Sequence, residues 1–187
     1  MRSLAALVLM SAALVACGSC AAQVEDVQDQ QLPPHCGKGY RMVFWMDRTA
    51  TEYIAAMREA GERWSERTDG CLSITVEEAD SEDIAASLCH VHQAVVSDGE
   101  PKTPGGGLIL GTANRCSGTN AAYVQFYRRH IGPEGFWKVT IADHELGHVF
   151  GFQHGGYDGC TMYEGVGYNT KWCDYDQVQC VHLGFCR

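Results

Sequence analysis

The chain has 187 residues, which predicts a single folded domain, and its 23 acidic against 14 basic side chains give a net charge of −9. An acidic chain without a Lys- or Arg-rich run repels phosphate backbones, so nucleic acid is excluded as an expected partner. Ten cysteines indicate an exported protein, because disulfides persist in oxidising compartments.

The N-terminus has the pattern of a signal peptide. A short basic start precedes the apolar run Leu4–Ala16, which is too short to span a bilayer as a helix. The run leads into Leu14–Val15–Ala16–Cys17, which resembles a bacterial lipobox, in which the cysteine is lipidated and becomes the new N-terminus. This predicts a signal peptide over residues 1–16, a lipid anchor on Cys17 and a flexible tether over residues 17–35.

The same resemblance bears on localisation. Gly18 stands where an aspartate commonly retains lipoproteins at the inner membrane, so we expect an outer-membrane lipoprotein if the source has an outer membrane. Ordinary cleavage after Ala22 is the alternative, and it would give a freely secreted extracellular protein.

The remaining cysteines predict a disulfide framework. With Cys17 lipidated and Cys20 in the tether, an even number is left, as suits an exported domain, and the sequence does not give their pairing. A Cys-rich zinc or iron–sulfur site is disfavoured because no Cys-x-x-Cys pair follows Cys20. The cysteines concerned are Cys36, Cys71, Cys89, Cys116, Cys160, Cys173, Cys180 and Cys186.

Residues 36–187 are predicted to form one domain of class α+β. Strand-forming runs occur at Tyr40–Trp45, Cys71–Val76, Leu108–Thr112 and Ala122–Tyr127. Helical patterns occur at Thr51–Arg67 with Thr51 as N-cap, at Phe136–Phe150, and at Asp174–Leu183 with Asp174 as cap. Residues 81–97 fit either a strand or a helix, and Pro101–Gly107 is a glycine-rich loop.

The chemistry is concentrated in one motif, His144–Glu145–x–x–His148–x–x–Gly151–x–x–His154. Residues four apart share one face of a helix, so His144 and His148 can bind one ion. A catalytic zinc site takes three protein ligands, and His154 can be the third only if the helix ends and the chain turns back. Gly151 permits this, because glycine adopts the left-handed conformation that ends helices. Glu145 is then placed to act as general base on a zinc-bound water.

With Met162 shortly after the third histidine, the motif resembles that of the metzincin clan of zinc endopeptidases. The resemblance implies a twisted mixed sheet, an active-site helix, a C-terminal helix and a Met-turn in which Met162 packs beneath the ligands. It also implies one catalytic Zn2+ and a protein or peptide substrate, and we expect a monomer. A substrate-binding rim strand is implied near Leu108–Thr112, with a simple buried strand as an equal alternative. Met162–Tyr163 and the domain size are most similar to the matrixin branch.

Three positions depart from the patterns of the clan. Gly155, directly after the third histidine, matches none of its common branches. Glu164 stands where astacin-like and serralysin-like members carry a tyrosine that can ligate zinc. Pro34–His35–Cys36–Gly37 is similar to the matrixin latency motif, but it abuts the first predicted strand, and the even cysteine count favours a disulfide for Cys36.

Two other functions stay open. A zinc-stabilised binding or adhesion lipoprotein would need the histidines but not Glu145, and a zinc hydrolase could act on something other than peptides. Calcium at Asp98–Gly99–Glu100 or Asp158–Gly159 matches no loop signature, so both segments are interpreted as turns. His90-x-His92 lacks a third ligand and is interpreted as a surface or structural pair.

Overall fold

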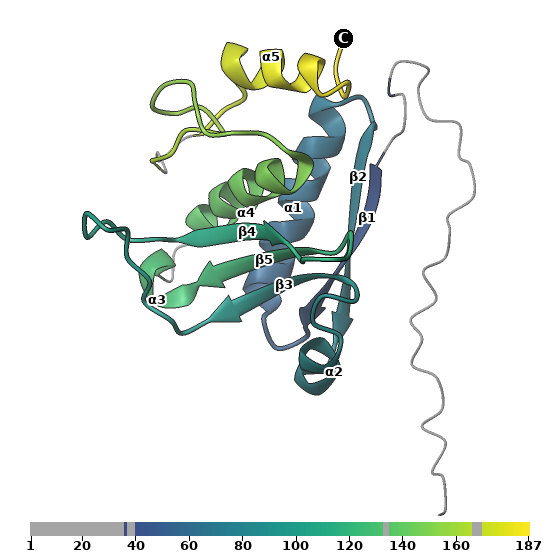
Figure 1. The fold of residues 1–187 in the computed structure, drawn as a ribbon, viewed down its shortest axis with the longest axis vertical. Helices are drawn as coiled ribbons and strands as arrows, with labels where there is room; N and C mark the ends of the chain where they lie inside the picture. The colour runs from purple at the N-terminus through teal and green to yellow at the C-terminus, as the bar shows by residue number, and fades with distance from the viewer. Residues whose placement is uncertain (1–35, 37–39, 133–134, 166–169) are drawn as a thin grey trace, which may run out of the picture. The chain divides into compact units, whose positions relative to one another are not determined.

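The computed structural model describes residues 36, 40–132, 135–165 and 170–187 (Figure 1). The chain divides into two units, Met1–Gln30 and Gln31–Arg187, and every described residue belongs to the second unit. The predicted signal peptide, Cys17 and the tether therefore lie outside the described residues. None of the described helices is both long and apolar enough to cross a membrane.

A five-stranded mixed sheet organises the domain, in the order β2–β1–β3–β5–β4. Neighbouring strands are parallel from β2 to β5, whereas β4 runs antiparallel to β5 and forms one edge of the sheet. The short connection between β4 and β5 requires this antiparallel pairing. The strands are β1 (Tyr40–Asp47), β2 (Leu72–Ala79), β3 (His92–Ser97), β4 (Gly111–Arg115) and β5 (Ala122–Tyr127).

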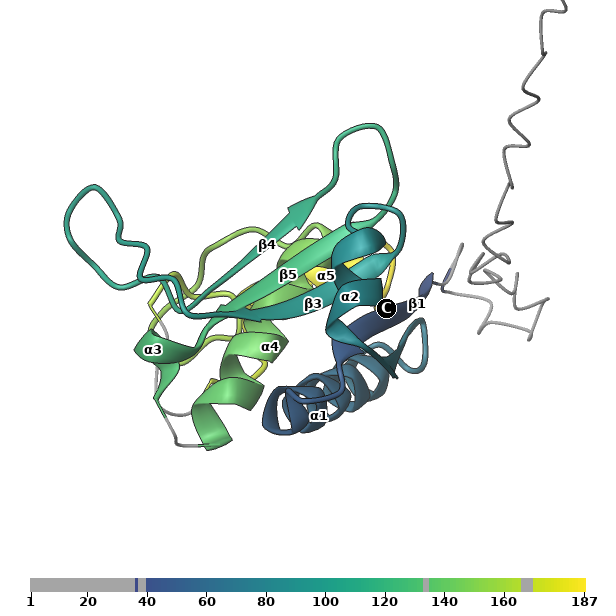
Figure 2. The same cartoon turned by 90° about the horizontal axis from the view of Figure 1, so that it is seen from below.

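Two long helices, α1 and α4, cover the same face of this sheet (Figures 1 and 2). Helix α4 packs against α1 on one side and against the edge strand β4 on another, so the helix that carries the histidine motif lies beside an open sheet edge. The helices are α1 (Thr51–Arg67), α2 (Ser81–Ala86), α3 (Arg128–Ile131), α4 (Gly135–Phe150) and α5 (Asp174–His182).

The hydrophobic core lies between the sheet and these two helices. Alternate residues of β5 are buried, as the period of two requires for a strand covered on one face. Trp64 is fully buried and donates from Nε1 to the carbonyl oxygen of Asp143 at 2.9 Å, which fixes α1 to the start of the histidine motif. The buried side of α1 confirms the predicted helical spacing and consists of Tyr53, Ile54, Ala56, Met57, Ala60, Gly61 and Trp64.

All eight cysteines from Cys36 onward form disulfides, which confirms the predicted framework. Cys36 bonds to Cys71 and so ties the chain before β1 to the start of β2, in agreement with the disulfide interpretation rather than a latency switch. Two of the disulfides, Cys160–Cys173 and Cys180–Cys186, stabilise the part of the chain after α4, where regular structure is sparse. The other pairs are Cys89–Cys116, Cys160–Cys173 and Cys180–Cys186.

Both predicted helix caps were wrong by one residue. Ala50, not Thr51, precedes α1, because the turn that leaves β1 makes the carbonyl of Ala50 the first helical acceptor, bonded to the amide of Ile54 at 3.0 Å. Cys173, not Asp174, is the N-cap of α5, because the carboxylate of Asp176 turns back to accept the Cys173 amide at 3.1 Å.

The elements in the middle of the chain also differ in detail from those predicted. Residues 81–97 contain both alternatives, first helix α2 and then strand β3. The strand predicted at Leu108–Thr112 begins only at Gly111, and Leu108 forms an isolated bridge to Lys102. The reason is that β5 ends at Tyr127 and continues into α3, so residues before Leu110 have no strand to pair with.

Candidate metal centre

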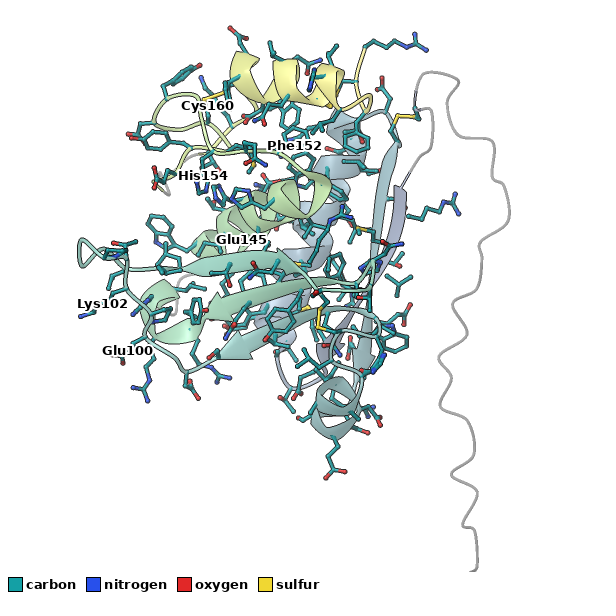
Figure 3. The ribbon with its side chains drawn as sticks, in the orientation of Figure 1. Glu100, Lys102, Glu145, Phe152, His154 and Cys160 are labelled. Carbon is teal, nitrogen blue, oxygen red and sulfur yellow. A yellow bond between two sulfur atoms is a disulfide. The ribbon has the colours of Figure 1, made fainter. Side chains whose placement is uncertain are left out.

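Three histidines converge at the end of α4. His144 and His148 lie one turn apart on α4, and Gly151, with a φ of 96°, ends the helix so that the following segment returns His154 to them. The three Nε2 atoms lie 2.9–3.1 Å from one another. Figure 3 shows His154 on the loop that follows α4. The predicted cluster is therefore assembled as a group whose ligand atoms could hold one ion.

Two of the three rings are oriented by backbone carbonyls. His144 Nδ1 lies 2.8 Å from the carbonyl oxygen of Thr161, and His148 Nδ1 lies 2.9 Å from that of Phe152. Because a carbonyl only accepts, each Nδ1 carries the proton and each Nε2 directs its lone pair to the centre. Within the described residues, His154 has no corresponding partner for Nδ1, so its position depends on its backbone.

Burial keeps the two helix-borne histidines neutral. It lowers the pKa of His144 to about 4 and also lowers the pKa of His148, and neighbouring histidines add to both effects. Neutral imidazole is the form that binds a metal. The Nε2 lone pairs of His144 and His148, which meet at 3.1 Å, repel one another unless a cation lies between them.

The donor set fits zinc. Three nitrogens of a tetrahedral zinc site, each about 2.0–2.1 Å from the ion, lie about 3.3 Å apart. The observed separations of 2.9–3.1 Å are close to this value. Three histidines also leave a fourth position for water or substrate, the arrangement of catalytic rather than structural zinc sites.

Glu145 is buried between α4 and β4, with 5% of its surface exposed (Figure 3). Burial raises the pKa of its carboxyl to about 8. In the described part of the chain, the side chain makes no hydrogen bond or ion pair. A buried carboxylate without a structural partner is costly, which favours a functional role for Glu145.

Gly111 makes room for this carboxylate and was missed by the sequence reasoning. A β carbon at Gly111 would lie 2.7 Å from Glu145 Oε1 and 2.8 Å from Ile141 Cγ2. No sequence signal marks this glycine, because the contact exists only where β4 crosses α4.

Met162 lies directly against α4. It is fully buried, and a β carbon on Gly147 would overlap its sulfur atom. The residue before it, Thr161, supplies the carbonyl that orients His144. The segment predicted to lie beneath the ligands is therefore in contact with the helix that carries two of them.

Asp176 supports this segment, and it too was missed. Its buried carboxylate accepts the amides of Thr161 at 3.1 Å and Met162 at 3.2 Å. Burial raises the pKa of Asp176, and these backbone donors oppose the rise. In the sequence it resembles any acidic residue in the first turn of a helix.

The secondary candidates have structural partners. His92 Nδ1 accepts a backbone amide of β5 at 2.9 Å, which supports its structural interpretation. Asp98 pairs with Arg128 at 3.1 Å and Glu100 with Arg129 at 2.8 Å, so the acidic groups of this turn face arginines rather than a calcium site.

The arrangement has a counterpart among solved structures. Archaemetzincin from Methanopyrus kandleri aligns with a TM-score of 0.54 over 81% of this chain and 98% of that chain, at 19% sequence identity. The domain shares the archaemetzincin fold. At this identity the likeness establishes the fold alone, and it confirms the predicted metzincin-like arrangement of mixed sheet and helices in coarse form. No protein-family model matches the sequence, and no curated protein matches it either.

Proposed function

We propose that the domain is a zinc-dependent endopeptidase that hydrolyses peptide bonds of proteins. The observation that carries this proposal is the convergence of three histidine Nε2 atoms within 3.1 Å of one another, beside a buried carboxylate that has no structural partner in the described chain. Zinc held by His144, His148 and His154 would supply a Lewis acid that polarises a carbonyl and lowers the pKa of a water.

Glu145 is the general base in this proposal. Its carboxylate takes a proton from the attacking water and later returns it to the leaving amine. Its buried surroundings favour this shuttle, because they bring the two protonation states of the carboxyl closer in free energy near neutral pH. Gly111 allows the carboxylate to occupy this position, because any side chain at residue 111 would overlap it.

The edge strand β4 is the proposed substrate platform. It pairs with β5 on one side only, so its other side offers backbone groups to an extended peptide. The edge position of β4 favours a substrate-binding rim strand over a strand buried between two others. The strand begins at Gly111 rather than at the predicted Leu108. The substrate strand would then lie across the mouth of the histidine cluster, because β4 packs on α4.

Met162 is the proposed Met-turn residue. Its contact with Gly147 places a soft, apolar side chain under the helix segment between Glu145 and His148. The matrixin-like sequence Met162–Tyr163 is consistent with this role, and Glu164 supplies no tyrosine ligand.

The proposal is tested by metal analysis together with digestion of a denatured protein mixture. Wild type should hold about one zinc per chain and cleave internal peptide bonds, and His148→Ala should lose most of the metal. Glu145→Ala should keep the metal and lose hydrolysis by roughly 100- to 10,000-fold, because only proton transfer is removed. Zinc without cleavage would favour the binding or adhesion alternative, and cleavage without zinc dependence would reject the mechanism.

The envelope location is a further part of the proposal, supported by the sequence Leu14–Val15–Ala16–Cys17. A lipid anchor on Cys17 would hold the protease at a membrane, as expected for an outer-membrane lipoprotein. Mass spectrometry of the mature chain should show an acylated N-terminal Cys17, and Cys17→Ala should release soluble protein. A mature chain that begins at Gln23 without lipid would instead indicate secretion.

A further inference from the structure

The third ligand is held differently from the other two. His144 and His148 are fixed by their place on α4, but His154 follows the helix, in an exposed segment. A ligand on a free segment would lose conformational entropy whenever it bound an ion, and fixing one residue corresponds to roughly a tenfold change in an equilibrium constant. The affinity of the site therefore depends on what orders this segment beforehand.

Gln179 holds the residue before the ligand at both of its backbone groups. The amide of Gln153 donates to Gln179 Oε1 at 2.7 Å, and Gln179 Nε2 donates to the carbonyl oxygen of Gln153 at 3.0 Å. One side-chain amide thus satisfies donor and acceptor together, as a neighbouring strand would.

Tyr175 holds the ligand residue itself. Its hydroxyl donates to the carbonyl oxygen of His154 at 3.1 Å, and its ring lies over Gly155 so closely that a β carbon there would overlap it. The amide of Gly155 in turn donates to the carbonyl oxygen of Met162 at 2.9 Å. Gly155, which matches no common branch of the clan, is explained by the ring that occupies its side-chain position.

Helix α5, which carries both residues, is itself firmly attached. It lies beside the segment that follows α4 (Figure 1), and its Asp176 binds the Thr161 and Met162 amides. Disulfide Cys160–Cys173 bonds the loop after α4 to the N-cap residue of α5, and Cys180–Cys186 bonds the last turn of α5 to the C-terminal segment. Because α5 is held by these bonds, its side chains can order the exposed segment 153–155.

We propose that Gln179 and Tyr175 are positioning residues that hold His154 in its zinc-binding place and thereby set the metal affinity of the site. The inference rests on the proposed zinc centre, but not on which substrate is cleaved. Loss of a group that orients a metal ligand typically weakens binding by roughly 10- to 100-fold, and contacts to the backbone correspond to the lower end of this range.

The test is competition with a chromogenic chelator for zinc on the purified protein with its disulfides intact. Gln179→Ala and Tyr175→Phe should each raise the zinc Kd by roughly tenfold. Tyr175→Phe removes only the hydroxyl and keeps the ring against Gly155, so it guards against a variant that fails to fold. Gln177→Ala is the matched control, because Gln177 is on the same helix but its side chain accepts from Trp172 Nε1 at 2.8 Å and donates to the carbonyl oxygen of Arg187 at 3.5 Å.

The outcomes separate this inference from the proposed function. Weaker zinc binding in both variants with an unchanged Gln177→Ala supports the inference, even if the wild type cleaves no peptide. Wild-type affinity in Gln179→Ala and Tyr175→Phe would overturn it while leaving the peptidase proposal in place. An equal loss in Gln177→Ala would also overturn it, because the effect would then come from general destabilisation of α5. A wild-type chain that binds no zinc would overturn both.

Discussion

Gly147 lies inside α4, where helix propensity and packing predict opposite results for replacement by alanine. In an exposed helix the change from glycine to alanine stabilises a protein by about 1 kcal/mol. Here a β carbon would overlap Met162 Sδ and would lie 3.0 Å from Met162 Cε and 3.1 Å from Trp64 Cζ2. Both neighbouring side chains are fully buried, so neither can move into solvent.

The packing effect is the larger of the two. Added atoms in a filled core cost about 1–3 kcal/mol. The upper part of that range applies because Trp64 is held by its bond to Asp143 and by edge-on contact with the ring of Phe152, at 4.8 Å between centroids. Gly147→Ala should therefore lower the free energy of unfolding by about 1–2 kcal/mol in net terms, or roughly 3–6 °C in Tm.

The assay is denaturant unfolding of the metal-free protein, followed by circular dichroism with the disulfides intact. The measurement is repeated in a Met162→Ala background, where the main overlap is removed and Gly147→Ala should become neutral or stabilising. A Gly147→Ala protein at least as stable as wild type would refute the packing of Met162 against Gly147. The proposed role of Met162 as the Met-turn residue under α4 would then be refuted as well.

Three further predictions concern Glu145 and the disulfides near α5. Gly111→Ala should lower kcat for peptide hydrolysis by roughly 10- to 100-fold by displacing the Glu145 carboxylate. Gly105→Ala is the control and should change kcat little, because its β carbon would meet only Thr103 Oγ1, at 3.9 Å. In the metal-free protein, burial raises the pKa of Glu145 from 4.5 to about 8, so the stability contributed by its proton is complete below pH 4.5 and is lost as pH rises through about 8. Unfolding of Glu145→Gln from pH 5 to 9 should lack this loss, and profiles parallel to wild type would contradict it. Replacing Cys160 and Cys173 with alanine should cost about 2–4 kcal/mol in the free energy of unfolding, more than removal of the shorter Cys180–Cys186 loop, and an equal or smaller loss would contradict the loop-entropy account.

The histidine motif could be interpreted from the sequence because its geometry is local. The spacing of His144 and His148 fixes their relation on any helix, and Gly151 marks where that helix must end. The long helices and most strands were predictable for the same reason, since their buried residues recur in the sequence with a period of 3.6 or 2. The start of β4 is decided by its pairing with β5, and it lies at Gly111, three residues after the predicted start at Leu108.

The sequence by itself therefore determined the three histidines of the candidate metal centre, the candidate base and the presence of a disulfide framework. Only the tertiary structure decided what surrounds them: the disulfide pairing, the glycine beside Glu145, and the α5 side chains that hold His154. The reason is physical. The contacts Gly111–Glu145 and Gln179–Gln153 join residues more than twenty positions apart, and no helical or strand period relates them. Their register is set by how β4, α4 and α5 pack, which depends on the side chains of the whole core at once.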